Sequence, residues 1–222
     1  MTTPLTPRVG RKPRGHGPER RGEILDAAKR LFAEEGYEHA TMRRIAGAIG
    51  LSSTALYVYF PDKAAILRAI AEQTFEELLI RLEPLARPET GLPPLARLRA
   101  GLRAYVAFGL ERPDEYRLIF SGRMMAPPGP GRPTYPCAAS PIEAADRSFD
   151  LLRQQVADLM QAGLLRPGDP ALVAETLWAC LHGVTSLLLD QRDQLASAPD
   201  ALIDCAIDLT LHGCVQRPEL AG

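Results

Sequence analysis

The chain has 222 residues and a net charge of −1, and 46% of its residues are hydrophobic, enough for one large or two smaller packed domains. No apolar run approaches the roughly 20 residues of a membrane-spanning helix, so we expect no membrane partner. No apolar stretch of the kind found in a secretory signal precedes Ile24, so we expect a cytoplasmic protein. The four cysteines show no Cys-x-x-Cys spacing, which disfavours disulfide and zinc sites and predicts neither metal nor cofactor.

The positive charge is concentrated at the front of the chain. Residues 1–68 carry 12 Lys and Arg against 7 Asp and Glu, whereas the remainder carries 14 against 20. A basic front and an acidic remainder indicate that only the front meets a polyanion, unless the imbalance arises by chance. Residues 1–17 mix basic residues with Pro and Gly without periodicity, which predicts a disordered basic arm. This arm either follows DNA or is simply solvated.

Helical periodicity begins at Pro18, and residues with cap or turn chemistry separate its segments. Six of the seven residues in 127–133 are Pro or Gly, which predicts a loop, and strand-like alternation is absent. The predicted helices cover residues 18–36, 41–50, 52–60, 62–82, 95–111, 113–121, 141–161, 170–191 and 199–214. The prediction is therefore an all-α protein of about nine helices. A three-helix domain at 18–68 precedes a larger helical domain at 69–222.

The stretch 41–63 reads TMRRIAGAIGLSSTALYVYFPDK and has the organisation of a helix-turn-helix. Gly50 permits the left-handed backbone of a sharp turn between two short helices. Ala46 is small enough for the second of these helices to cross closely. Leu51, Leu56 and Phe60 would fill the space between them.

Helical geometry assigns two faces to the helix that begins at Ser52. Leu56 and Phe60 share the inward side. Thr54, Val58 and, more loosely, Ala55 face outward. An outward valine suits a thymine methyl group better than it suits water, so this face is predicted to enter the DNA major groove.

Two tyrosines and two arginines border that face. Tyr57 and Tyr59 flank it, where their hydroxyls could reach phosphates on either wall of the groove. Arg43 and Arg44 lie in the first turn of a helix capped by Thr41, where cations oppose the helix dipole. An adjacent phosphate would reverse that effect, and Arg43 is long enough to reach a guanine edge. The alternative is that both arginines are only solvated.

Taken together, residues 20–70 resemble the DNA-binding domain of the tetracycline-repressor (TetR) family. The matching positions are Phe32, Gly36 and Tyr37; Thr41, Ile45 and Ala46; Gly50, Leu51 and Ser52; Leu56, Tyr57, Tyr59 and Phe60; and Lys63. The resemblance implies phosphate contacts by Thr41, Tyr57, Tyr59 and Lys63. It places Arg43, Ser53, Thr54, Ala55 and Val58 nearest the base edges, and Arg44 and Ser52 complete the predicted DNA-binding set. The family often has Gly at the position of Thr54, so relatives do not supply the operator sequence.

The second half also resembles one part of that family. The segment 111–120, ERPDEYRLIF, is followed by Trp178 and His182-Gly183, as in a subgroup with a Trp-x-x-x-His-Gly signature. Trp178 and His182 are four residues apart and share a helix face. The aromatic residues predicted to surround an effector pocket are Tyr105, Phe108, Phe120, Phe149, Trp178 and His182. The alternative is a packed core in which His182 hydrogen-bonds a neighbour and Gly183 allows close helix contact.

The last two predicted helices, 170–191 and 199–214, carry more apolar faces than one copy needs. Their Leu, Ala and Cys content predicts a four-helix interface with a second copy of the chain. Function requires the same arrangement, because a lone helix-turn-helix reads few base pairs and two-fold pairing doubles the contact.

The sequence thus predicts a homodimeric regulator that leaves a palindromic double-stranded operator when a small hydrophobic effector binds, with repression as the habit of the family. The effector would shift the fourth helix, which links both halves. An effector-independent architectural DNA-binding protein is the alternative. An enzyme is not expected, because His39, Cys137, His182 and Cys214 lie in no nucleophile, phosphate-loop or metal motif.

Overall fold

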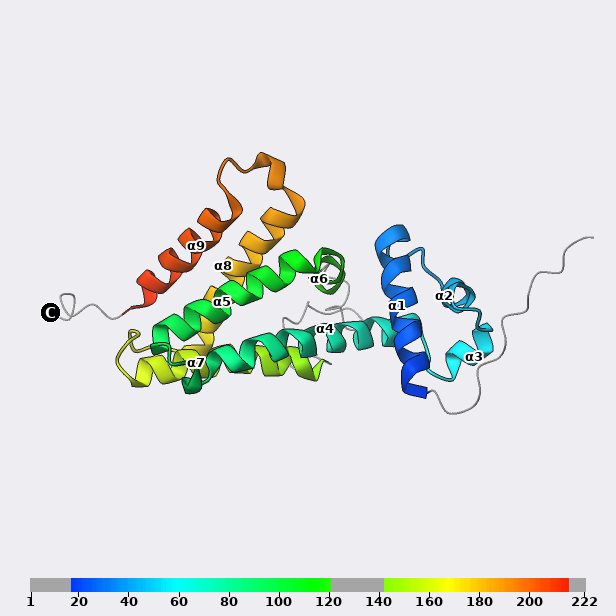
Figure 1. The fold of residues 1–222 in the computed structure, drawn as a ribbon, viewed down its shortest axis with the longest axis horizontal. Helices are drawn as coiled ribbons and strands as arrows, with labels where there is room; N and C mark the ends of the chain where they lie inside the picture. Colours follow the sequence, from blue (N-terminus) through cyan, green and yellow to red (C-terminus); the bar gives the residue numbers. More distant parts are fainter. Residues whose placement is uncertain (1–16, 121–141, 216–222) are drawn as a thin grey trace, which may run out of the picture. The chain divides into compact units, whose positions relative to one another are not determined.

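The computed structural model describes residues 17–120 and 142–215, so almost all of the predicted arm, the predicted loop at 127–133 and Cys137 lie outside the described residues. Within these ranges the protein is all-α, as predicted, and contains no strand beyond an isolated bridge between Leu165 and Val215. The helices, labelled in Figure 1, are α1 Gly17–Glu35, α2 Met42–Ala48, α3 Ser53–Tyr57, α4 Lys63–Ala86, α5 Pro94–Glu111, α6 Pro113–Phe120, α7 Glu143–Gln161, α8 Pro170–Asp190 and α9 Pro199–Cys214, with 3₁₀ turns η1 Pro88–Thr90 and η2 Arg192–Gln194.

Two helix ends differ from the prediction. α4 continues past Pro84 to Ala86, and a proline two residues before the end of the helix costs only one helical hydrogen bond. α3 ends at Tyr57, and the chain reaches Phe60 through a turn in which Tyr59 N and Phe60 N both donate to Leu56 O at 2.9 and 3.1 Å. Pro61 disfavours helical backbone in the residue before it, which accounts for the early end.

The chain divides into two compact units, and the first ends at Ile70. Its helices are delimited by local chemistry that the sequence predicts. Thr41 Oγ1 accepts from Arg44 N at 3.3 Å and Ser52 Oγ accepts from Ala55 N at 3.2 Å, so each hydroxyl caps its helix. Gly50 has φ +66°, the left-handed conformation of the turn. The core of this unit is formed by Ile24, Ala28, Phe32, Ile45, Ala46, Leu56, Phe60, Ile66 and Ile70, all buried.

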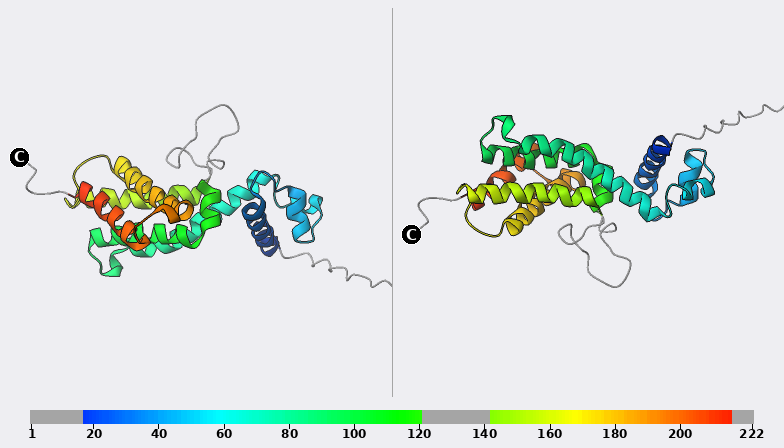
Figure 2. Two further views of the ribbon diagram at one scale, coloured as in Figure 1. Left: turned by 90° about the horizontal axis from the view of Figure 1, so that it is seen from above. Right: turned by 90° about the horizontal axis from the view of Figure 1, so that it is seen from below.

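The second unit begins at Ala71 and is a bundle built around α8, which contacts α5, α7 and α9 (Figures 1 and 2). A main core cluster joins these helices through buried Leu, Ile and Val side chains. A second cluster joins the later turns of α4 to α5, α6 and α7 through Phe75, Phe108 and Ile119. Ion pairs from Arg112 to Glu77 of α4 border that second cluster.

By length and composition alone, α8 is apolar enough to cross a membrane, so the expectation that no segment approaches such a span is wrong for this helix. Its packing explains the apolarity, because one side of α8 contributes Ala174, Leu177 and Leu181 to the main core cluster. A core helix of a globular bundle passes the same test of hydropathy.

Candidate functional site

The outward surface of α3 carries uncharged side chains that have no core to fill. Leu56 is fully buried, whereas Val58, two residues later, is 81% exposed. Thr54 and Tyr57 are also exposed, and Ser53 and Ala55 are half-buried. The two caps keep donor capacity: Thr41 and Ser52 use their hydroxyl oxygens as acceptors and are exposed, so each hydroxyl hydrogen remains available to a phosphate.

Arg43 and Arg44 are adjacent and both exposed, but their surroundings differ. The guanidinium of Arg44 forms an ion pair with Glu35 at the end of α1. Arg43 has neither an ion pair nor a hydrogen bond from its side chain within residues 17–120 and 142–215. Its charge is therefore not paired within the described residues, and of the two arginines it is the one more available to DNA.

Lys63 serves a structural purpose in the first unit. Its ammonium Nζ donates to the carbonyl oxygens of Tyr37, Glu38 and Ala40 at 2.5, 3.2 and 3.0 Å, and it lies 4.3 Å from the Tyr37 ring centroid. An ammonium has three donors, and all three are directed at the α1–α2 connection. This contact fixes the loop that precedes Thr41.

Tyr59 is positioned by its backbone. Arg21 of α1 donates to Tyr59 O at 3.4 Å and places its guanidinium carbon 4.2 Å from the centroid of the Phe60 ring. The turn after α3 is thereby attached to α1, and the side chain of Tyr59 is left half-buried.

A cavity lies inside the second unit, with about 70 Å³ of space open to water-sized atoms. Four of the six aromatic residues predicted for an effector pocket line it, namely Tyr105, Phe120, Phe149 and Trp178. Apolar side chains provide most of the remaining wall, and the polar exceptions are Ser148 and Gln155. The sequence did not indicate the contribution of α4, whose Phe75, Leu78 and Leu82 also line the cavity.

Phe108 and His182 do not line this cavity. Phe108 is buried in the second core cluster, where the guanidinium carbons of Arg81 and Arg112 lie 5.2 and 4.6 Å from its ring centroid. His182 lies behind the aromatic wall, with ring centroids 4.7 Å from Phe120 and 5.7 Å from Trp178.

Four of these residues form a chain of hydrogen bonds. Trp178 Nε1 donates to Tyr105 Oη at 3.2 Å, Tyr105 Oη lies 3.1 Å from Tyr116 Oη, and Tyr116 Oη lies 2.6 Å from His182 Nδ1. Burial raises the pKa of both tyrosines and lowers the pKa of His182, so all three favour their neutral forms at neutral pH. The sequence drew attention to segment 111–120 but not to Tyr116 as its functional member.

Close helix contact occurs at Gly109 rather than at Gly183. A methyl group at Gly109 would lie 2.6 Å from Thr185 Cγ2 and 2.9 Å from the Tyr116 ring, whereas one at Gly183 would meet nothing within 4 Å. The interpretation of Gly183 as a contact glycine is therefore wrong within this chain. Gly109 instead lets Tyr116 approach α5.

One face of α8 and α9 has no partner within the described part of the chain. Leu172 and Leu187 of α8 and Leu209 of α9 are exposed, and Leu209 is 72% exposed. The exposed Ala179 and Cys205 also lie on these helices. The face thus combines large apolar groups with small ones.

Both units match models of known protein families. Residues 24–70 match the model of the bacterial regulatory proteins of the tetR family, and residues 98–210 match that of the tetracyclin repressor-like C-terminal domain. An HTH-type transcriptional repressor of Mycobacterium tuberculosis is 46% identical over 63 residues, covering 28% of this chain and 34% of the relative. The HTH-type transcriptional activator FasR of Mycolicibacterium smegmatis is 33% identical over 139 residues, covering 60% of this chain and 59% of the relative.

The chain therefore spans about a third and about three fifths of the lengths of these two relatives. A solved structure of a protein of unknown function from Rhodococcus sp. RHA1 is 27% identical, with a TM-score of 0.71. The likeness covers 88% of this chain and 95% of that one.

Proposed function

This chain belongs to the TetR family of transcription regulators, and from that premise we propose that it is a ligand-responsive repressor of a palindromic operator. In this proposal two copies bind the operator through α2 and α3, and both leave it when a small apolar molecule enters the cavity of the second unit. In the proposal the protein acts in the cytoplasm, and binding and release of DNA involve no catalytic residue.

The observation that carries the DNA-binding part is the exposed, uncharged face of α3 beside the exposed Arg43. An apolar Val58 at 81% exposure gains nothing from water but can contact a thymine methyl group. In the proposal Thr54, Ala55 and Val58 read bases with Arg43, and Thr41, Ser52, Tyr57 and Tyr59 bind phosphates. The engagement of Lys63 with three carbonyls supports an indirect part for it, in positioning Thr41.

DNA binding is tested by measuring the affinity of the protein for the duplex upstream of its own gene and for a random duplex at moderate salt. Arg43→Ala is expected to weaken binding to the upstream duplex by about 1–3 kcal/mol and to narrow the difference in affinity between the two duplexes. Arg153→Ala is the matched control, because Arg153 is an exposed arginine of α7 that pairs only with Asp150 in the described residues. Equal affinity for both duplexes would refute the proposal.

The cavity supports ligand response over an architectural role. An internal space lined by Phe75, Leu78 and Leu82 connects ligand binding to α4, the helix whose first turns contribute Ile66 and Ile70 to the DNA-binding unit. A ligand that occupies this space and alters the course of α4 would bias the paired recognition helices.

Gly101 offers a direct test of the ligand site. It lines the cavity, and a methyl group at this position would meet nothing within 4 Å. The Cβ of a leucine at this position meets no obstacle, so Gly101→Leu is expected to occupy space in the cavity, to keep operator affinity and to abolish release by any effector. Gly101→Ala is the control that should still respond. If operator affinity of the native protein does not change across a library of small apolar molecules, the architectural alternative is favoured.

The homodimer is proposed to form through the exposed face of α8 and α9. Leu209→Glu places a charge at the centre of an apolar interface and is expected to give monomers in sedimentation analysis. Ile80→Glu is the control, because Ile80 is 70% exposed but lies on α4. A dimer that survives Leu209→Glu would exclude this face.

A further inference from the structure

The hydrogen bonds that join Trp178, Tyr105, Tyr116 and His182 all donate in one direction, and this direction determines which ligand group the cavity can accept. The first member of this chain of hydrogen bonds fixes the sense, because the indole N–H of Trp178 can donate but cannot accept. Tyr105 Oη therefore accepts from Trp178, and its own hydrogen is left to find a partner at Tyr116 Oη, 3.1 Å away.

The last member of the chain is compatible with the same sense. Burial lowers the pKa of His182, so its ring is neutral at neutral pH and one ring nitrogen is an acceptor. With Nδ1 as that acceptor, Tyr116 donates to it at 2.6 Å, so each of the two tyrosine hydroxyls both accepts and donates one hydrogen bond. In the opposite sense Trp178 and Tyr116 would both donate to Tyr105 Oη, and the Tyr105 hydrogen would have no acceptor among the described protein groups, which costs free energy in a buried site.

The other hydroxyl of the lining is also committed. Ser148 Oγ donates to Ala144 O at 2.8 Å, so its lone pairs are what remains for a ligand. None of the described residues that line the cavity carries a charge, so an ionised ligand would find no counter-charge among them. Gln155 is the one lining residue whose amide can both donate and accept.

We propose that the cavity takes an uncharged apolar ligand bearing a hydroxyl that donates to Tyr105, and that Tyr116 is the residue that sets this preference. The inference rests on the proposed ligand site and adds its chemical class. Tyr116 does not line the cavity, so it acts by holding the Tyr105 hydrogen and keeping the Tyr105 oxygen as an acceptor. Alcohols are preferred, whereas ketones, which only accept, and carboxylates, which are charged, are disfavoured.

Trp178 is the only tryptophan of the chain and lines the cavity, so its fluorescence reports binding directly. Titration of the full chain with 1-pentanol, 2-pentanone and pentanoate compares three ligands of similar size. One net hydrogen bond corresponds to a preference on the order of 5- to 10-fold for the alcohol over the ketone. Pentanoate is expected to bind more weakly than either.

Tyr116→Phe removes the acceptor of the Tyr105 hydrogen, which then turns towards the cavity as a donor. The alcohol-to-ketone ratio of dissociation constants is expected to shift towards the ketone in this variant and to stay unchanged in Tyr37→Phe, the same change in the connection between α1 and α2. His182→Leu is a second variant, which covers the case in which Tyr116→Phe does not fold. It leaves the Tyr116 hydroxyl in place, and the freed Tyr116 hydrogen can turn to Tyr105 as well as to Thr185 or Ser186, so a smaller shift in the same direction is expected. His182→Gln keeps an acceptor and should preserve the native ratio.

The outcomes separate the inference from the function on which it rests. A native preference for the ketone or the carboxylate, or an unchanged ratio in Tyr116→Phe and His182→Leu, overturns the inference while ligand binding itself stands. A fluorescence signal that does not respond to any of the three probes overturns the inference, and the proposed ligand site fails with it if Gly101→Leu also leaves the response to every effector unaltered.

Discussion

Both units consist of helices that bury apolar faces, but they place their candidate functional side chains differently. In the first unit the candidate functional side chains lie on the surface, and the apolar side chain of Val58 is exposed without a partner in the described residues. In the second unit the side chains of the candidate ligand site are buried or half-buried, and Tyr105, Tyr116 and His182 form hydrogen bonds with one another. A surface site can therefore lose a side chain without loss of the fold, whereas an internal site shares its residues with the core.

The largest effect is expected from a comparison within α3. Leu56→Ala removes a fully buried side chain from the first unit and should lower the free energy of unfolding by about 2–5 kcal/mol. Val58→Ala, two residues later, should change it by no more than about 0.5 kcal/mol yet reduce operator affinity. Chemical denaturation and DNA titration of both variants check this, and a destabilised Val58→Ala would contradict the assignment of the two faces.

A smaller loss of stability is expected in the second unit, at Gly109, the glycine against which Tyr116 packs. Gly109→Ala forces a methyl group into Thr185 and Tyr116 and should cost about 1–3 kcal/mol. Gly183→Ala on α8 meets nothing within 4 Å and should be neutral or slightly stabilising through helix propensity. Thermal unfolding of the pair distinguishes the two glycines, and equal losses would contradict the packing described for Tyr116.

These contrasts also explain what sequence could predict. The faces of α3 followed from helical geometry because Leu56 and Phe60 point inward within a few residues of the turn that orients them. The cavity did not follow, because its wall combines α4, α5, α6, α7 and α8, and an aromatic residue that lines a cavity has the same spacing as one that fills a core. Phe108 and Phe120 illustrate this, since one is packed between arginine side chains and the other lines the cavity.

The close contact at Gly109 was equally hidden, because nothing near it in sequence distinguishes it from Gly183. Which glycine seats a neighbour depends on Thr185 and Tyr116, which come from two other helices. The Lys63 contact with three carbonyls depends likewise on residues about 23 to 26 positions away. In each case the missing information is the tertiary contact rather than the local propensity.

A pH effect is expected from the second unit. Burial lowers the pKa of His182, whose neighbours from α6 are Tyr116 and Phe120 and from α8 is Trp178. Between its folded pKa and the ordinary value of 6.5, the unfolded chain binds more protons, so stability rises with pH and is lost as pH falls below about 6.5. His182→Gln should flatten this part of the pH profile of thermal unfolding. An identical slope in both proteins would show that His182 is not the group responsible.

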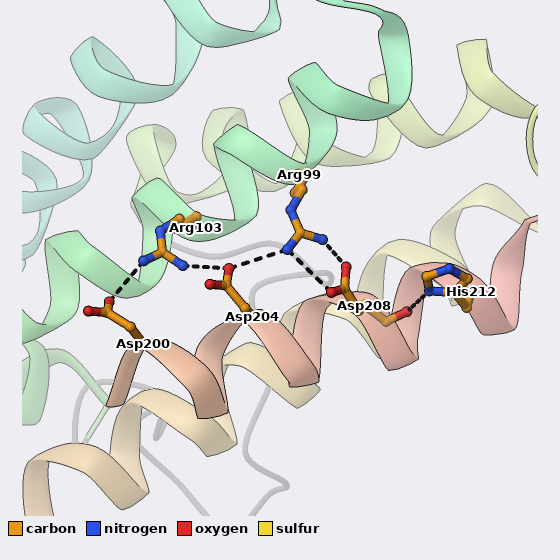
Figure 3. A network of polar contacts seen from close by, with 6 residues as sticks. All are labelled: Arg99, Arg103, Asp200, Asp204, Asp208 and His212. Atoms are coloured by element: carbon orange, nitrogen blue, oxygen red, sulfur yellow. Dashed lines mark hydrogen bonds and ion pairs between the residues drawn. The ribbon is translucent and has the colours of Figure 1, made fainter. Parts of the chain in front are cut away.

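The smallest effect is expected from the most conspicuous charges of the second unit, a ladder between α5 and α9 (Figure 3). Asp204 joins two arginines, accepting from Arg99 Nη2 at 3.3 Å and from Arg103 Nη1 at 2.5 Å, whereas Asp200 accepts from Arg103 alone and is 83% exposed. Because these side chains are exposed to solvent, Asp204→Asn should lower the free energy of unfolding by less than about 1 kcal/mol, and Asp200→Asn by still less.

The difference between native protein and Asp204→Asn should shrink at 1 M salt, where the screening length is only about 3 Å. Asp158→Asn on α7 is the control, since the Asp158 side chain accepts from Gln154 and pairs with no cation in the described part of the chain. A loss that is large and independent of salt would mean that the ladder is part of the core. The expected small loss would instead mean that these ion pairs align α9 with α5. Arg99 and Arg103 are one helical turn apart on α5, and the aspartates that they contact are one turn apart on α9, so the pairs form in one relative position of the two helices.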